Sequence, residues 1–397
     1  MNAAYIPYGA YWSTPFARWQ GSFAHLHALE FAAHTATAEL AKRKIDPRQF
    51  DYGVLGTTIP QKQSFYGLPW LTGMIGADAV GGPTISQACA TSARCLQAAA
   101  QEISGGDATT ALIVTADRTS NGPHVFYPAP SAPGGTGQSE NWVMDNFGHD
   151  PFANVAMIET AENVARKYQI SREEQHEVVL RRYEQYRAAK PEFFARYMTL
   201  PFAVPDAKFK KTLGTLTGDE GVVATSAEAL GKLKPVTPGG TVTYGGQTHP
   251  ADGNAGIVVT TQDKARDMSA RPDIAIRLTG FGMARTDRAH MPQAPVPAAR
   301  RALERAGRTI GDVMAVKSHN PFAVNDIVFA RETGFDVTAM NNNGCSLIWG
   351  HPQGPTGLRA IIELIEELTE RGGGVGLFHG CAAGDTAMAV VVEVGDG

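Results

Sequence analysis

The stretch SQACATSARCLQAAAQEISGGDATTALIVTAD, residues 86–117, contains the pattern from which the fold can be predicted. Apolar residues recur at helical spacing over 92–104, and Gly105–Gly106–Asp107 then predicts a turn. The run TALIVTA at 110–116 predicts a buried strand. A helix that leads through a tight turn into a buried strand is typical of α/β layers with a mixed or parallel sheet.

A second stretch, residues 351–378, repeats this order, with a helical pattern, a glycine run and the strand-like VGLF. Leu112 in the first strand lies 23 residues after Cys89, and Val375 in the second strand lies 24 residues after His351. The matched spacing predicts an internal duplication. Such a duplication would place Cys89 and His351 each at a helix N-terminus, facing one shared pocket.

The composition is that of a folded globular protein. The chain has 397 residues, of which 43% are hydrophobic and 19% charged, which is typical of two or three domains with buried cores. A net charge of −4 argues against nucleic-acid binding. No apolar run reaches the roughly 18 residues of a membrane span, and no secretory signal is visible. The few cysteines, none of them two residues apart, predict reduced thiols in the cytoplasm and no zinc ribbon; they are Cys89, Cys95, Cys345 and Cys381.

The region between the two stretches has a different character. Residues 122–150 are rich in proline, glycine and polar residues, which indicates a loop. Helical patterns follow, with a break near Gln169–Ile170. Ser171 and Glu174 then form a capping box for a helix over 172–189. We therefore expect a separate segment inserted into the first half of the chain.

Four residues on loops between predicted strands and helices are candidates for nucleophilic chemistry. Cys89 lies among small residues before the predicted helix, where the helix dipole and free N–H groups would lower its pKa and favour the nucleophilic thiolate. His351, in GHPQGPTG, is placed to accept a thiol proton. Cys381 lies in HGCAAG and His319 in SHNPF. Each residue type is also common in plain packing, so only the four together indicate a catalytic site.

Segments along nearly the whole chain resemble the thiolases, in the same order. They are STPFARWQGSF (13–23), the stretch 86–117, MIETAENVARKYQISREEQHE (157–177), GDEGV (218–222), GGTVTYGG (239–246), NNNGCSLIWGHPQGPTGLR (341–359) and HGCAAG (379–384). The resemblance implies the α/β thiolase fold, with two similar βαβαβαββ halves in five layers (αβαβα) and an inserted loop domain. The halves would comprise residues 1–121 plus 240–268, and 269–397. The CoA-binding loop domain would comprise 122–239.

The resemblance also implies a role for each candidate residue. Cys89 would take up the acyl group, His351 would activate it, and Cys381 would act as acid and base at the carbon beside the thioester. His319 falls where the NEAF motif has its asparagine, because this sequence reads HNPF, and it would form one oxyanion hole with His351. The backbone N–H groups of Cys89 and Ala383 would form the other.

The implied ligands are CoA and acyl-CoA, with no permanently bound cofactor and no metal. Thr248, His249 and Met157 would contact CoA. The reaction would be thiolytic cleavage of a 3-ketoacyl-CoA through an acyl-Cys89 intermediate, or the reverse Claisen condensation. A homodimer or homotetramer is implied, without a nucleic acid or a membrane. Some divergent thiolases also act with a small OB-fold partner subunit.

Departures from the family pattern leave alternatives open. CAAGD is shorter than the usual CxGGG turn, and with the gap placed before the cysteine, His379 rather than Cys381 would be the second acid/base. Cys345 replaces a paired glycine, and Val223 replaces the arginine after DEG. The imidazole of His319 in place of the family amide favours a degradative thiolase for an unusual, branched or aromatic acyl chain. The alternatives are an acetoacetyl-CoA thiolase, a thiolase-like acyl-CoA binder without turnover, and a ketosynthase-like condensing enzyme.

Overall fold

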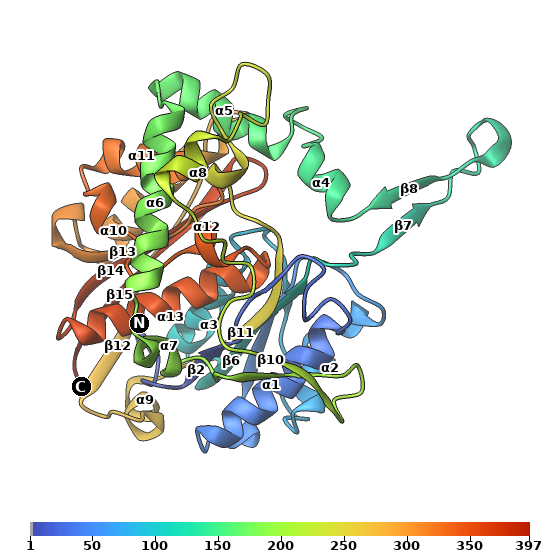
Figure 1. Cartoon of the computed structure of the whole chain (residues 1–397). Helices are drawn as coiled ribbons and strands as arrows, with labels where there is room; N and C mark the ends of the chain where they lie inside the picture. The colour runs from blue at the N-terminus through green and yellow to red at the C-terminus, as the bar shows by residue number, and fades with distance from the viewer. Residues whose placement is uncertain (1–2) are drawn as a thin grey trace.

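Two sets of strands, one from each half of the chain, form the centre of the protein (Figure 1). The computed structural model describes residues 3–397. In hydrogen-bonded order, the first set is β5 (Thr84–Ile85), β4 (Tyr52–Gly56), β6 (Thr110–Arg118) and β11 (Ala251–Thr260), and the second is β13 (Val313–His319), β14 (Gly374–Ala382), β15 (Thr386–Asp396) and β12 (Ile274–Arg285). β1 (Ala4–Tyr5) pairs with both β11 and β12, so hydrogen bonds join the two sets.

The two halves repeat one order of elements. The first half runs through β2 (Tyr11–Ser13), β3 (Ala17–Arg18), α1 (Ala28–Lys42), β4, α2 (Leu68–Met74), β5, α3 (Thr91–Gly105), β6 and β11. The second runs through β12, α10 (Pro295–Ala306), β13, α11 (Ala323–Thr333), α12 (Ser346–Trp349), α13 (Gly354–Glu370), β14 and β15. A parallel pair, β4–β6 or β13–β14, is followed by an antiparallel pair, β6–β11 or β14–β15. This repetition confirms the predicted duplication.

One expected strand is missing from the second half. Where the first half has β5, the second has a 3-10 turn at Val337–Ala339. The Asn341 N–H still donates to the Val316 carbonyl at 2.8 Å. Asn341 and Asn343 both have left-handed backbone, with φ of 59° and 66°, and this conformation ends an extended strand.

The helices α3 and α13 lie in the middle of the molecule and pack on each other. α13 contacts strands of both sets, whereas α1 and α2 cover the outer face of the first set and α10 and α11 that of the second. The order of layers is therefore αβαβα, as expected. The close contact of α10 with β12 depends on Gly282, because a Cβ there would lie 2.0 Å from the Ala298 carbonyl oxygen.

The helices and strands expected in the two matched stretches are present as α3, β6, α13 and β14. Ser171 caps α6 (Arg172–Ala188), and its Oγ accepts from the Glu174 N–H at 3.1 Å. α5 (Met157–Tyr168) ends at Gln169, which has a left-handed φ of 53°. These ends agree with the predicted break and with Ser171 as the N-cap, but the capping box is only half formed, because the Glu174 carboxylate accepts from Arg331 instead of the Ser171 N–H.

The prediction of a loop over 122–150 is wrong in part. The segment contains a hairpin of β7 (His124–Tyr127) and β8 (Gln138–Asn141), followed by α4 (Met144–Gly148). The strands are too short for an alternating pattern to stand out from the surrounding proline and glycine. In Figure 1 the hairpin projects away from the rest of the molecule.

The inserted segment lies between β6 and β11. After the hairpin it contains α5, α6, α7 (Pro191–Ala195), β9 (Phe202–Pro205), β10 (Thr212–Leu216) and α8 (Ala227–Gly231), and α9 (Gln262–Met268) follows β11. Among the described residues, 3–397, we find no helix that combines the length and apolar character needed to cross a membrane.

Candidate active site

Cys89 lies in the tight turn that leads into α3. The preceding residue, Ala88, has a φ of 46°, a conformation that L-residues other than glycine rarely adopt. Such strain in a folded protein is typical of functional sites. Cys89 is half-buried, whereas Cys95, further along the same helix, is fully buried. The turn therefore leaves Cys89 partly exposed at the start of the helix.

His351 approaches this sulfur from the other half of the chain. Its Nε2 lies 3.1 Å from Cys89 Sγ, and its Nδ1 lies 2.6 Å from Thr356 Oγ1. The Cys89 thiol also donates to Gln353 Oε1 at 3.3 Å, so its one hydrogen has two acceptors. Gln353 caps α13 with a φ of 65°, so strained backbone lies on both sides of the sulfur.

The imidazole of His319 stacks on that of His351, with ring centroids 4.0 Å apart. Its Nδ1 lies 2.9 Å from Ser346 Oγ, and its buried Nε2 has no hydrogen-bond partner in the part of the chain that the structure describes. One ligand atom from each of Cys89, His319 and His351 lies within 4.8 Å of the other two. The structure therefore brings together three residues that are far apart in the sequence.

Cys381 and His379 both lie on β14, on the side that faces α11. Asn325 Nδ2 donates to Cys381 Sγ at 3.2 Å, and the Cys89 thiol is close enough to contribute, after burial, to raising the pKa of Cys381. The His379 ring instead stacks on Phe329, with centroids 3.8 Å apart, and neither of its nitrogens has a hydrogen-bond partner within residues 3–397. Cys381 is therefore the better placed of the two to serve Cys89.

The resting site is uncharged, in contrast to the thiolate expected from the sequence. Burial raises the pKa of the Cys89 thiol to about 12, although the backbone N–H groups of Ala383 and Cys89 itself act to lower it. Burial also lowers the pKa of His351 to about 3 and that of His319 well below its usual value. The expectation was wrong because the loss of hydration outweighs the effect of the helix N-terminus.

A cavity of about 310 Å³ adjoins the catalytic loops. It is lined by residues of α6, α8 and α12 and of the loops around Val223 and His249. The His249 carbonyl accepts from the His351 N–H at 2.9 Å, which connects the cavity wall to the loop of His351. Of the three residues expected to contact CoA, only His249 lines the cavity. Thr248 Oγ1 instead donates to the Ser346 carbonyl at 2.5 Å, and Met157 is not among the lining residues.

Family models match nearly the whole chain. The model described as "Thiolase, N-terminal domain" matches residues 10–263, and "Thiolase, C-terminal domain" matches residues 273–394. The chain belongs to the thiolase family. Thiolases are acyltransferases, and the family expected from the sequence motifs is confirmed.

Similar proteins agree with this assignment. The acetyl-CoA acetyltransferase of Paracoccus denitrificans is 30% identical, covering 96% of this thiolase and 97% of its own length. The human mitochondrial 3-ketoacyl-CoA thiolase is 29% identical, covering 96% of each chain. A crystal structure of the human mitochondrial 3-ketoacyl-CoA thiolase superimposes with a TM-score of 0.89 at 26% identity, covering 99% of both chains. The expected thiolase fold is therefore confirmed.

Several residues around the site of this thiolase were not predicted. Gln353 and Thr356 follow His351 closely, so their positions in the same loop were a usable signal. Ser346 and Asn325 contact His319 and Cys381 across long chain separations, and nothing in the sequence connects these pairs. Such contacts become visible only after folding.

Asp117 is the most connected of the unpredicted residues. One of its carboxylate oxygens accepts from the backbone N–H groups of Thr58 and Ile59, and the other accepts from that of Gly354 at 2.8 Å. Burial raises the pKa of Asp117 to about 6. Through these hydrogen bonds, the Asp117 carboxylate connects the start of α13 to the first half of the thiolase. It thereby also holds the loop of His351 and Gln353 in place. The only sequence signal for Asp117 was its position directly after the apolar run 110–116.

We expect the free energy of unfolding to decrease as the pH falls from about 6.5 toward 4. Burial lowers the pKa of His379 to about 4, so below pH 6.5 the unfolded chain binds a proton that the folded chain does not. The folded state therefore has its full stability when the pH is above the pKa of histidine in the unfolded chain. This stability decreases as the pH falls below that pKa. The loss is up to about 1.4 kcal/mol per pH unit for each such histidine.

Urea unfolding between pH 4.5 and 7.5 measures this slope. His379→Phe removes one titrating group and keeps a ring against Phe329, so it is the matched variant. Its unfolding free energy should depend less steeply on pH than that of the unmodified chain. Equal slopes for the two proteins would contradict a neutral, buried His379.

Proposed function

We propose that this thiolase cleaves a 3-ketoacyl-CoA by thiolysis through an acyl-Cys89 intermediate. The observation that supports it most strongly is the 3.1 Å separation between His351 Nε2 and Cys89 Sγ. His319 and Cys381 complete the set of acid, base and hydrogen-bonding groups around this sulfur. An uncharged site fits the proposal, because the thioester and keto groups that enter it are uncharged, and negative charge develops on their oxygens only when the nucleophile attacks.

In the first half-reaction, Cys89 Sγ attacks the keto carbon and its proton passes to His351 Nε2. The bond between the α and keto carbons then breaks, and the acyl group stays on Cys89. The released acyl-CoA enolate takes a proton at its α carbon from the Cys381 thiol. Negative charge develops on oxygen in these steps, so nearby hydrogen-bond donors lower the barrier; we assign this role to His319 and His351, and to the N–H groups of Cys89 and Ala383.

In the second half-reaction, a CoA thiol transfers its proton to the Cys381 thiolate and attacks the acyl-Cys89 thioester. The acyl group leaves as acyl-CoA. The Cys89 thiolate recovers the proton held by His351, which restores the resting site. Every proton is thus returned, and CoA is the only co-substrate required.

We place the CoA chain in the cavity beside His249. A neighbouring hollow, which shares Thr225 with this cavity, is lined by Arg187 and Ser226, and it extends the surface available to the nucleotide end of CoA. Val223 lines the first cavity with 76% of its surface exposed, at the position where the family arginine is absent. A change at Val223 therefore alters charge beside the cavity without disturbing the core.

Val223→Glu should raise the KM for CoA up to about fivefold at low salt and leave kcat unchanged, because CoA phosphates repel a carboxylate. Val223→Gln is the uncharged control of nearly the same size. Val223→Arg should shift KM in the opposite direction, and added salt should shrink both effects. If Glu and Gln give the same KM at low salt, CoA does not pass Val223.

For the acyl group, we propose an unusual chain, branched or aromatic, rather than acetoacetyl-CoA. The support is that His319 stands where the family motif has an asparagine, so the hydrogen-bonding group beside Cys89 differs from the usual amide. A panel of 3-ketoacyl-CoA thioesters with CoA, followed by loss of the 3-ketoacyl thioester absorbance, tests this specificity. Acetoacetyl-CoA as by far the best substrate would contradict it.

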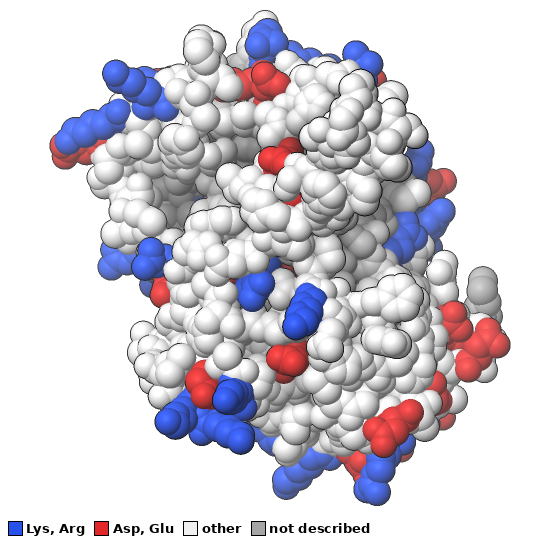
Figure 2. Space-filling model, turned by 90° about the vertical axis from the view of Figure 1, so that its right-hand side faces the viewer, with Lys and Arg blue, Asp and Glu red and all other residues white. Residues whose placement is uncertain are grey.

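For assembly, we propose a homodimer or homotetramer that uses the β7–β8 hairpin. An isolated two-stranded hairpin is marginally stable in water, and this one exposes Phe126 and Tyr127. Figure 2, which views the molecule from the side of the hairpin, shows mostly uncharged side chains over the middle of this face. Light scattering measures the state, and turnover by this chain alone would exclude a required OB-fold subunit.

A further inference from the structure

The buried imidazole of His319 faces two different environments. Its Nδ1 lies 2.9 Å from Ser346 Oγ, and its Nε2 has no partner among the described residues. Burial lowers the pKa of His319 well below its usual value, so the ring is neutral and only one nitrogen carries hydrogen. The position of that hydrogen decides whether Nε2 donates or accepts a hydrogen bond.

The Ser346 hydroxyl has one hydrogen and two acceptors within reach. The first is His319 Nδ1, and the second is Asn320 Oδ1 at 3.1 Å. The backbone N–H of Asn320 donates to Ser346 Oγ at 3.1 Å, so Oγ already accepts one hydrogen bond. Asn320 Oδ1 has a second donor in the Leu347 N–H at 3.2 Å, whereas His319 Nδ1 has no other partner.

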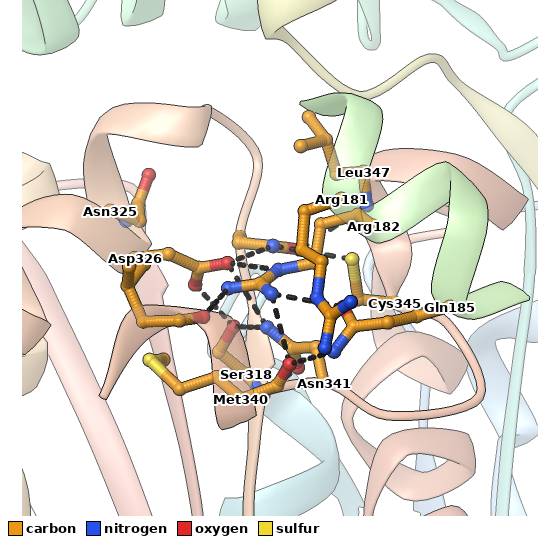
Figure 3. Close-up of polar contacts among 12 residues, drawn as sticks. Arg181, Arg182, Gln185, Ser318, Asn325, Asp326, Met340, Asn341, Cys345 and Leu347 are labelled. Carbon is orange, nitrogen blue, oxygen red and sulfur yellow. Dashed lines mark hydrogen bonds and ion pairs between the residues drawn. The ribbon is translucent and has the colours of Figure 1, made fainter. Parts of the chain in front are cut away.

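The orientation of the Asn320 amide is fixed by its contacts with a buried polar network around Asp326 and Arg182, and Figure 3 shows this network. Asn320 Nδ2 donates to the Asp326 carboxylate at 2.8 Å and to Cys345 Sγ at 3.3 Å, so its amide oxygen has to face Ser346. Asp326 is held in turn by Arg182 Nε at 2.9 Å, in an ion pair whose two side chains are fully buried. The two acceptors near the Ser346 hydroxyl, His319 Nδ1 and Asn320 Oδ1, are therefore fixed in position before substrate binds.

We propose that the Ser346 hydroxyl donates to His319 Nδ1 and so fixes the tautomer in which Nε2 carries the hydrogen. His319 then presents an N–H donor to the thioester oxygen, the role that the proposed function assigns to it, and the inference rests on that function. Ser346 is in this sense a positioning residue, because it acts on the substrate only through His319. The arrangement satisfies both Asn320 Oδ1 and His319 Nδ1.

The two stacked imidazoles then have opposite tautomers. His351 needs a free lone pair on Nε2 to accept the Cys89 proton, so its Nδ1 carries hydrogen and donates to Thr356 Oγ1. His319 needs hydrogen on Nε2 to stabilise an oxyanion. The Thr356 hydroxyl thus accepts from His351, whereas the Ser346 hydroxyl donates to His319. As a result His351 can act as a base at Nε2, and its neighbour His319 can act as a hydrogen-bond donor at Nε2.

The test is nitrogen NMR of the full chain labelled with 15N at its histidine rings, with the His319 signals assigned by comparison with His319→Asn. The two ring nitrogens differ strongly in chemical shift according to which carries hydrogen. We expect the Nε2–H form in the unmodified protein, a shift toward Nδ1–H in Ser346→Ala, and recovery of Nε2–H in Ser346→Thr. An Nδ1–H form in the unmodified protein, or no change in Ser346→Ala, would overturn the inference.

A double-mutant cycle adds a kinetic readout. Ser346→Ala should lower kcat roughly 10- to 100-fold with little change in KM, since it weakens one oxyanion donor without removing the ring. In a His319→Asn background the same change should have no further effect, because an amide carries its own N–H₂. Equal losses in both backgrounds would mean that Ser346 acts on structure alone. The NMR result stands even when no 3-ketoacyl thioester is turned over, so it separates this inference from the proposed function.

Discussion

Cys89→Ser is expected to lower thiolysis by at least about 10³-fold, the largest effect of any single change. A hydroxyl is a far weaker nucleophile than a thiol near neutral pH, and removing a nucleophile removes the covalent route altogether. His351 would not make up for the weaker nucleophile. Burial lowers the pKa of its imidazole to about 3, so it is too weak a base to activate a serine hydroxyl. Steady-state thiolysis with the best substrate of the panel measures the loss.

Intact mass measurement after incubation with acyl-CoA follows the same change directly. The unmodified protein should gain the mass of one acyl group, and Cys89→Ala should gain none. Cys95→Ala is the matched control, because Cys95 lies on the same helix but is fully buried in the core. An adduct that survives in Cys89→Ala would exclude Cys89 as the nucleophile. CoA binding without an adduct in the unmodified protein would favour the acyl-CoA binder.

Cys381→Ala should separate the two parts of the reaction. Cleavage of the carbon–carbon bond should decrease roughly 10²- to 10⁴-fold, the usual contribution of a general acid or base. Uptake of an acyl group from a simple acyl-CoA should continue, because Cys89 and His351 remain in place 3.1 Å apart. Parallel measurements of 3-ketoacyl-CoA cleavage and of the Cys89 adduct show whether the two activities separate.

The alternative residue supplies the control for this prediction. His379→Phe keeps a ring against Phe329 and removes both nitrogens, so it should retain cleavage if Cys381 is the acid and base. Cys381→Ser fills the same space as the thiol and distinguishes a chemical loss from a packing defect. Full cleavage by Cys381→Ala together with loss in His379→Phe would transfer the role to His379.

Part of this site was open to prediction because its signals are local. The helix and strand of the stretch 86–117, and the N-cap at Ser171, depend on neighbours within a few residues along the chain. The order of motifs placed Cys89 and His351 in matching positions of two halves, and the halves face each other as expected. The loop over 122–150 failed because two short strands in a polar, glycine-rich segment leave no usable periodicity.

The sequence by itself determined the family and the two repeated halves, and it supplied the candidate reactive side chains. Only the tertiary structure showed that burial raises the pKa of Cys89, and that Cys381 contacts Asn325 whereas His379 stacks on Phe329. The contacts of Ser346 and Asp117 with the catalytic loops also came from folding alone. The physical reason is that pKa values and hydrogen positions depend on burial and on partners distant along the chain, and local sequence patterns carry no information about either.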